Sequence, residues 1–408
     1  MNPTPLRDAA LQIVRRLREN EHIALWAGGC VRDQILGIEP KDYDIATDAV
    51  PARVIELFRH TRKVGAQFGV VLVRIGRIWT EVATFRSDLP YEDGRHPSGV
   101  VFSSPEEDAH RRDFTVNGLF FDPIEECVVD YIDGQTDLAA GIIRAIGDPV
   151  ARFREDHLRL IRAVRFAARF GFQIEPGTKN ALTEQASNLR DVSRERVRDE
   201  LAMMLQDPQR CAALDLLVEH KLLEHVWSAA EWSPQRVADC RRILSALKEP
   251  VSFELGMASL LHDHDPSACR RVCRDLTCSN DSLGRICRLV ARGDGLLEAH
   301  PPDLGELKVL MDDRGFDDLM NFYRARLLAE DRSEKPWTEL RRRADAIPPH
   351  AVRPDPFVRG DDLIEAGLEA GPAYKRILDR VYMAQLREEI QSRSEGLELL
   401  RQCLEEEA

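Results

Sequence analysis

The sequence contains no long apolar run, although 43% of its 408 residues are hydrophobic. A membrane-spanning helix needs about 20 consecutive apolar residues, and no stretch approaches that length. The N-terminal segment is amphipathic and charged, without the apolar core of a secretory signal. We therefore expect a cytoplasmic protein with no membrane partner.

Paired cysteines are also missing. The nine cysteines are scattered, and their only cluster comprises Cys269, Cys273, Cys278 and Cys287. Structural zinc sites usually contain C-x-x-C pairs, and this cluster has none. The spacing therefore predicts ordinary thiols in a reducing compartment.

An excess of positive charge is the third absence. The formal net charge is -13, which argues against a nucleic-acid binder. However, residues 152–169 contain six arginines against two acidic residues. A local basic patch attracts phosphates even in an acidic chain, so the overall charge does not exclude nucleic-acid binding.

Strands and helices are mixed at the start of the chain, whereas the remainder is predicted to contain helices only. Apolar runs at 23–27, 70–75 and 78–84 predict strands, and Gly76-Arg77 predicts a hairpin. Helical patterns occupy 5–20, 31–36, 51–58 and, in two pieces, 105–121. An α+β domain is thus expected to end near Gly147. The helices expected after it include one after Pro149 that carries 155–169 and one over 372–402.

Two neighbouring motifs predict a phosphate and metal site. Gly28 and Gly29 lie between a predicted strand and a predicted helix, where bare backbone amides can hold phosphate oxygens and Arg32 can add charge. Asp42 and Asp44 are two residues apart on an extended segment, so their side chains share a face. Carboxylates bind hard cations, and two Mg²⁺ ions can promote phosphoryl transfer. An ordinary turn and two solvated aspartates are the alternative.

Further polar residues can complete such a site. Glu81 is either a third carboxylate beside the aspartates or a charge on the solvated strand face. The segment RRDFTVN contains Arg112, Asp113 and Asn117. Guanidinium groups clamp phosphates, and a carboxylate and an amide can hydrogen-bond a ribose. An amphipathic helix with an ion-paired face would show the same pattern.

The helix expected after Pro149 carries Glu155, Asp156 and Arg159. Asp156 and Arg159 are three residues apart and would be neighbours on one helical face. An ordinary ion pair explains this spacing. A base reader also explains it, because a carboxylate accepts from the amino group of cytosine or adenine and a guanidinium donates to a ring acceptor. The basic side of the helix continues with Arg162, Arg165 and Arg169.

His262-Asp263 resembles the HD dyad of metal phosphohydrolases. Such sites need further histidine and aspartate ligands, and the preceding His220 and His225 do not supply that pattern. A degenerate remnant is the favoured interpretation. An HD-type phosphohydrolase, or a non-catalytic RNA-binding protein on the same scaffold, remains the alternative of another class.

Together these motifs resemble the class II tRNA nucleotidyltransferase and bacterial poly(A) polymerase superfamily. Between residues 20 and 210 its motifs follow in order: GGCVRD with DYDIAT, EVATFRSD with YEDGR, RRDFTVN, REDHLR and SRERVRDEL. The resemblance implies a polymerase-β-like head (1–147) and a helical neck (148–208), body (209–300) and tail (301–408). It also implies addition of C, C and A to a tRNA 3′ end from CTP and ATP, without a nucleic-acid template.

The resemblance and the residue types together assign roles to single residues. Asp42 and Asp44 would bind Mg²⁺ and activate the 3′ hydroxyl, with Glu81 as a further catalytic candidate. The nucleotide would be held by Gly28, Gly29, Arg32, Arg112, Asp113, Asn117, Glu155, Asp156, Arg159 and Arg162. Arg165 and Arg169 would contact RNA, and the tail would contact tRNA.

Two segments bear on the product of the reaction. Ser87 to Ser98 matches the flexible loop that CC-only members lack. Residues 64–71 depart from the G-R-R/K-F…A-H-V segment of proteobacterial poly(A) polymerases, and Val116 and Gly118 are mild departures in the ribose motif. Complete CCA addition is therefore favoured, with A-only addition or polyadenylation as alternatives. The sequence does not indicate an oligomeric state.

Overall fold

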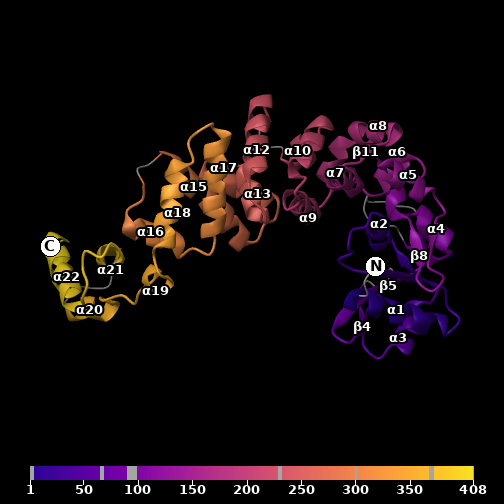
Figure 1. Ribbon diagram of the computed structural model, residues 1–408, viewed down its shortest axis with the longest axis horizontal. Coiled ribbons are helices and arrows are strands. Elements are labelled where there is room, and N and C mark those ends of the chain that lie inside the picture. Colours follow the sequence, from indigo (N-terminus) through magenta and orange to yellow (C-terminus); the bar gives the residue numbers. More distant parts are fainter. Residues whose placement is uncertain are drawn as a thin grey trace. The chain divides into compact units, whose positions relative to one another are not determined.

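The structure is a computed structural model that describes residues 4–64, 69–89, 99–227, 232–298, 301–366 and 372–407. The chain divides into two compact units, Met1–Trp232 and Ser233–Ala408 (Figure 1). None of the described helices combines the length and apolar character that crossing a membrane requires. The division into head, neck, body and tail remains a prediction.

A mixed seven-stranded sheet forms the centre of the first unit, in the order β3-β4-β5-β2-β1-β8-β9. β1 pairs antiparallel with β2 and β8, and β2 pairs parallel with β5. Ala27, the last residue of β1, pairs with Asp44, the first residue of β2. The Gly28-Gly29 turn therefore begins opposite the aspartates. The strands are β1 Ala24–Ala27, β2 Asp44–Thr47, β3 Thr61–Lys63, β4 Val70–Ile75, β5 Ile78–Thr84, β8 Phe120–Asp122 and β9 Cys127–Val129.

Short helices and two small strand pairs surround this sheet. The helix α1 packs on the sheet through Ile13, Val14 and Leu17, which are fully buried. Thr4 caps α1, and a proline occupies its first turn. The elements are α1 Pro5–Arg18, α2 Gly29–Ile35, α3 Pro51–Leu57, α4 Pro105–His110, the 3₁₀ helix η2 Thr115–Asn117, α5 Gly134–Ala140, and the pairs β6 Arg86–Asp88 with β7 Val100–Phe102 and β10 Ile142–Ile143 with β11 Gln173–Ile174.

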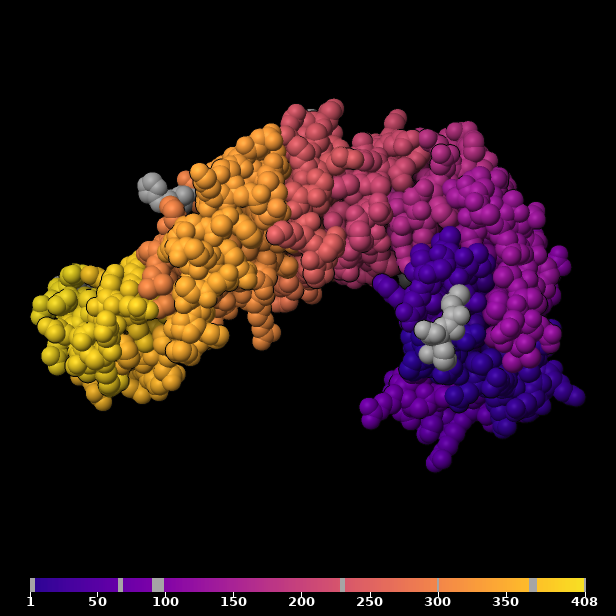
Figure 2. Space-filling view, viewed as in Figure 1, coloured from indigo at the N-terminus to yellow at the C-terminus, as the bar shows by residue number. Residues whose placement is uncertain are grey.

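The helices after Pro149 complete the first unit. The apolar face of α7 is buried, and α7 packs against α9 and α10. Atoms of the sheet domain (indigo) and of these helices (magenta) form a continuous surface in Figure 2. The helices are α6 Pro149–Glu155, α7 Leu158–Phe170, α8 Pro176–Glu184, η3 Ala186–Asp191, α9 Arg194–Leu205, α10 Arg210–Glu219 and α11 Leu223–Val226.

The second unit is helical throughout the part that the structure describes. α17 packs against α12, α15 and α18, which lie beside one another in Figure 1. A separate apolar cluster joins the last helices around Leu363, Val381 and Leu400. The helices are α12 Pro234–Ala246, α13 Phe253–Leu260, α14 Pro266–Asp275, α15 Asn280–Glu298, α16 Leu304–Met311, α17 Phe316–Ala329, α18 Lys335–Asp345, α19 Pro349–Val352, α20 Gly360–Glu365, α21 Pro372–Leu386 and α22 Arg393–Glu407.

The α+β head followed by helices is confirmed, but several predicted elements were wrong. The second part of the predicted helix over 105–121 is η2 and the strand β8, because Phe120 and Phe121 pair with β1. The helix expected over 372–402 is two helices. The region after 148 contains the strand β11, which pairs with β10. Most of the predicted loop Ser87–Ser98, and part of 64–71, lie outside the described residues; Ser87 itself belongs to β6.

The helix expected after Pro149 is interrupted at Asp156. This residue has extended backbone angles, φ −144° and ψ 104°, and ends α6. One oxygen of its carboxylate accepts a hydrogen bond from the backbone N–H of Leu158 at 3.1 Å and so caps α7. The predicted neighbours Asp156 and Arg159 are therefore not on one continuous helix.

The packing of α5 against η2 gives a test of this part of the fold. A Cβ atom on Gly134 would lie 2.4 Å from the carbonyl oxygen of Thr115 and 2.9 Å from Leu119 Cδ2. Gly134→Ala is therefore expected to lower the free energy of unfolding by about 1–3 kcal/mol, measured by urea denaturation.

Gly295 provides the matched control for this substitution. It lies in α15, and an added Cβ would meet nothing within 4 Å. Gly295→Ala should be neutral or stabilise the protein by up to about 1 kcal/mol. Equal effects of the two substitutions would show that η2 is not held by close packing against α5.

Candidate functional site

The Gly28-Gly29 turn brings the first predicted motif beside the second. Gly28 has a left-handed φ of +69°, and a Cβ there would lie 2.7 Å from Arg112 Nη1. Its N–H donates to the Leu119 carbonyl at 2.9 Å, which continues the pairing of β1 with β8 by one residue. Gly29 begins α2. Of the two amides predicted to hold phosphate, the structure therefore commits that of Gly28 to β-sheet bonding.

Two further carboxylates, Asp42 and Glu81, lie near enough to Asp44 at the start of β2 to repel its charge. Glu81 precedes Val82, which pairs with Ile45, so Glu81 lies level with Asp44 on the neighbouring strand. The Asp44 side chain keeps contact with solvent. Partial burial and then repulsion by Asp42 and Glu81 nevertheless raise the pKa of Asp44 to about 7. Such crowding of like charge is relieved by a bound cation.

The electrostatics therefore fit a metal at Asp42 and Asp44. Within the described residues, no three His, Cys, Asp or Glu side chains are grouped so that they could hold one metal ion. Glu81 is thus close enough to affect the charge of Asp44 but does not form a three-residue ligand set with the aspartates. Its catalytic role remains a prediction.

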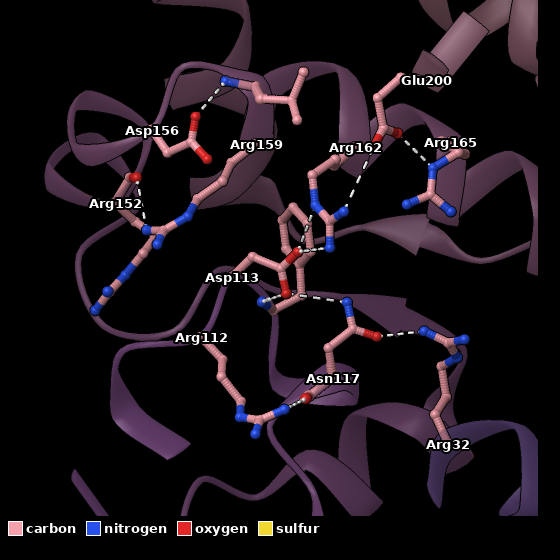
Figure 3. A network of polar contacts seen from close by, with 12 residues as sticks. Arg32, Arg112, Asp113, Asn117, Arg152, Asp156, Arg159, Arg162, Arg165 and Glu200 are labelled. Atoms are coloured by element: carbon pink, nitrogen blue, oxygen red, sulfur yellow. Dashed lines mark hydrogen bonds and ion pairs between the residues drawn. The ribbon is translucent and has the colours of Figure 1, made fainter. Parts of the chain in front are cut away.

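Asp113 is the centre of a buried polar network (Figure 3). One oxygen of its carboxylate accepts from the N–H of Phe114 at 2.8 Å and from Asn117 Nδ2 at 3.0 Å. The other accepts from Arg162 Nε and Nη2 at 2.9 and 2.7 Å. Burial opposes ionisation, but Arg162 and the hydrogen bond from Asn117 outweigh it and hold the pKa of Asp113 well below its usual range. Both oxygens predicted to contact a ribose are thus engaged within the protein.

Asn117 extends this network to the predicted triphosphate site. Its side-chain oxygen accepts a hydrogen bond from Arg32 Nη1. Arg32 is buried, also donates to Asp33 at 2.6 and 2.8 Å, and lies 4.6 Å from the ring centre of Phe170. Arg112 is paired instead with the buried carboxylate of Asp108. These contacts fix the orientation of both arginines before any ligand binds.

The predicted base readers are held by different partners. Asp156 receives two hydrogen bonds from Arg196, at 2.8 and 3.0 Å. Arg159 donates to Glu155 at 2.6 Å and to the carbonyl of Arg152 at 3.0 Å. The two side chains therefore do not bond to each other, and Figure 3 shows both in the same region of the site.

Two residues of α9 were missed as site residues by the sequence reasoning. Arg196 orients Asp156, and Glu200, which is 3% exposed, pairs with Arg162 and with Arg165 at 3.4 and 2.5 Å. Both belong to the SRERVRDEL motif. Their spacing of four residues places them on one helical face, which is the signal that could have identified them.

These elements enclose a cleft of about 470 Å³. Eight arginines and three aspartates line it, and it contains every predicted site residue except Asp42, Glu81 and Glu155. Arg165 and Arg169 also line it; Arg165 is largely buried, and Arg169 lies 3.4 Å from Asp33. Eight arginines on a concave surface suit a polyphosphate ligand, although each of them also contacts a carboxylate of the protein.

Known proteins resemble this chain in sequence and in fold. The families described as "Poly A polymerase head domain" and "Probable RNA and SrmB- binding site of polymerase A" match residues 24–144 and 171–231. The CCA-adding enzyme of Geobacillus stearothermophilus is 33% identical over 396 residues, which are 95% of each chain. The chain belongs to the family of CCA-adding enzymes and bacterial poly(A) polymerases.

Other members of this family differ in how much of the chain they match. The crystal structure of the Bacillus stearothermophilus CCA-adding enzyme in complex with CTP has a TM-score of 0.82 and 29% identity, covering 99% of both chains. Poly(A) polymerase I of Escherichia coli O157:H7 is 39% identical over 231 residues, which are 54% of this chain and 50% of that one. The family consists of nucleotidyltransferases that are generally metal-dependent.

The second unit does not assemble the hydrolase site suggested by His262-Asp263. Asp263 pairs with Arg236 at 3.2 Å and with His264 at 2.9 Å. The Nδ1 atom of His262 lies 3.1 Å from the carbonyl oxygen of Ser259. The carboxylate that a metal would need is thus paired with a guanidinium. The part of the chain that the structure describes contains no cluster of three metal ligands.

The Asp113–Arg162 pair makes a prediction about stability and pH. Asp113→Asn is expected to lower the free energy of unfolding by about 3 kcal/mol at pH 7, because it leaves a buried guanidinium partly uncompensated. The folded-state pKa of Asp113 lies below its ordinary value of 3.8. The stabilisation is therefore present above about pH 4 and is lost as pH falls further.

Urea denaturation at pH 7, 5 and 3 tests this prediction. The difference between wild type and Asp113→Asn should be constant from pH 7 to 5 and smaller at pH 3. Asp191→Asn, at an exposed carboxylate, is the control and should change stability little. A difference that did not depend on pH would contradict the ionised pair.

Proposed function

We propose that this protein is a CCA-adding tRNA nucleotidyltransferase, which adds C, C and A to the tRNA 3′ end from CTP and ATP. The observation that carries the proposal is the arginine-lined cleft, in which Asp156 and Arg159 lie together with Asp44. The match to a CCA-adding enzyme over 95% of both chains supports it. A tRNA-processing enzyme of this kind would act in the cytoplasm.

The reaction is an in-line displacement at the α-phosphorus of the nucleotide. The 3′-hydroxyl oxygen of the RNA forms a bond to this phosphorus, the bond to the bridging oxygen of the β-phosphate breaks, and pyrophosphate leaves. The hydroxyl proton would pass to solvent water beside Asp42 and Asp44. The arginines of the cleft would balance the charge of the triphosphate and of the leaving group.

Asp42 and Asp44 would hold Mg²⁺, and two such ions would stabilise the attacking and leaving oxygens. The convergence of negative charge on Asp44 supports this assignment. Arg32 and Arg112, which their partners hold in place, would contact the phosphates. Arg165 and Arg169 are at the same time candidates for RNA contact.

Asp156 and Arg159 would select the base without a nucleic-acid template. Cytosine and adenine both place an amino group beside a ring acceptor, whereas guanine and uracil place a carbonyl there. Asp156 can accept from that amino group while Arg196 holds it, and Arg159 can donate to the ring acceptor while Glu155 holds it. Because both side chains are fixed, the same pair can read C and A.

The domain assignment is part of the proposal: a catalytic head over 1–147, a neck over 148–208, a body over 209–300 and a tRNA-contacting tail over 301–408. The family match at 24–144 supports the head, and the match at 171–231 overlaps the neck and the start of the body.

The product identifies the function. Purified protein is given tRNA transcripts that end before CCA, after C or after CC, with CTP, ATP or both. Products are sized to one nucleotide. We expect completion of CCA on all three transcripts and no tail beyond it. Addition of A alone, or of a long A tail, would instead indicate an A-adding enzyme or a poly(A) polymerase.

Asp42 and Asp44, at the start of β2, should be required for nucleotide transfer but not for nucleotide binding. Asp42→Ala and Asp44→Ala are each expected to lower kcat for incorporation by at least about 10³-fold, because the metal would lose a ligand. The Kd for CTP without metal, measured by calorimetry, should change little. A wild-type rate for Asp42→Ala would refute the metal assignment.

Base selection should depend on the separate pair. Asp156→Ala and Arg159→Ala should reduce discrimination against UTP and GTP by about 10–100-fold, since each loses about one specific hydrogen bond. Competition between CTP and UTP on the transcript without CCA measures this ratio. Asp191→Asn is the control, and unchanged selectivity in both variants would remove the base-reading role.

A further inference from the structure

A second cavity, of about 390 Å³, lies beside the nucleotide cleft within the first unit. It shares Arg165 and Arg169 with that cleft. Lys41 lines it from the sheet domain, and this residue directly precedes the metal-site candidate Asp42. The cavity therefore borders the nucleotide cleft at the two shared arginines and extends to the residue before Asp42.

The lining combines positive charge with an apolar floor. Lys41 is exposed and Arg169 is half-buried. Met203 of α9 is 46% exposed, although it is strongly apolar. The only acidic residue of the lining, Asp207, accepts a hydrogen bond from the N–H of Gln209 at 2.8 Å, so its carboxylate is turned toward the start of α10. Phosphate oxygens fit the cations, and a base fits the apolar floor.

We propose that this cavity binds the 3′-terminal nucleotide of the acceptor RNA strand. Lys41 and Arg169 contact its phosphate, and Met203 packs against its base. The inference rests on the proposed function and adds the position of the second substrate. The family match over 171–231, described as a probable RNA-binding site, covers Met203 but not Lys41.

The chemistry of methionine explains how one site accepts a changing strand end. The terminal nucleotide differs after each addition, so a contact that read its base would stop the reaction after one step. A thioether side chain adapts its shape and makes no base-specific hydrogen bond. Phosphate contacts are equally independent of sequence. Base choice thus stays with Asp156 and Arg159, which face the incoming nucleotide.

Binding of a tRNA transcript that ends before CCA tests the cavity separately from catalysis. The Kd is measured by fluorescence anisotropy as a function of KCl concentration. Lys41→Gln should weaken binding by about 5–10-fold and reduce the salt dependence, with a slope smaller by about 0.7, because one phosphate contact is lost. Met203→Ala should weaken binding by about 3–10-fold and leave the slope unchanged, because the contact is apolar.

Matched controls are available on the same unit. Lys63→Gln removes an exposed lysine of β3, and Val218→Ala removes an exposed apolar side chain of α10. Both should bind the transcript as wild type does. The Kd for CTP should be the same in Lys41→Gln and Met203→Ala as in wild type, which also shows that the variants are folded.

A photo-crosslinking residue in place of Met203 provides the positive test. It should crosslink to the terminal nucleotide of the transcript. Crosslinks only at internal positions, or wild-type Kd and salt slope in both variants, would refute the cavity assignment and leave the proposed function intact. A different outcome would refute the proposed function instead: Lys41→Gln and Met203→Ala weaken transcript binding as expected, but the wild-type protein incorporates no nucleotide.

Discussion

The arrangement of the site depends on one buried ion pair, between Asp113 and Arg162. The two residues are 49 positions apart, and their pairing joins the segment before η2 to α7. Asp113 also holds Asn117, which holds Arg32, while Arg162 reaches Glu200 on α9. This pair is costly to break because Asp113 would lose its cationic partner and Arg162 would keep only the longer contact to Glu200. It therefore fixes how the sheet domain and the helices together form the cleft.

The cleft concentrates charged side chains of both signs. Each of its eight arginines is paired with a carboxylate of the protein, whereas Asp44 is crowded by its acidic neighbours. Such a site is preorganised: its dipoles and charges are already placed, so binding a polyanion and a cation requires little rearrangement. Gly28 contributes by having no side chain, since Arg112 occupies the space that a Cβ would need.

Chemistry, base choice and strand binding lie on different elements of one unit. The carboxylates Asp42 and Asp44 lie at the start of β2, opposite the end of β1. The base readers lie at the break between α6 and α7 and just after it. At the break, Asp156 caps α7 and accepts a hydrogen bond from Arg196. The acceptor cavity uses α9 and the loop before Asp42. The shared arginines of α7 connect these places, which brings both substrates to the same carboxylates.

Local features were readable from the sequence alone. The apolar run before Gly28-Gly29, the hairpin at Gly76-Arg77 and most helices depend on neighbours a few residues away, so their patterns survive without tertiary contacts. The motifs also located twelve of the sixteen residues that line the cleft. In contrast, Phe120 and Phe121 read as helix, because the short strand β8 to which they belong is defined by its partner β1. The break at Asp156 depends on a capping bond that periodicity does not show.

The sequence by itself thus determined the family, the α+β head and the residue types of the site. Only the tertiary structure decided which charges meet. Asp113 turned out to be engaged with Arg162, Asp156 with Arg196, and Arg159 with Glu155, and Glu200 entered the site from α9. The physical reason is that an ion pair is set by distance in space, and the fold brings together positions that lie tens of residues apart in the chain.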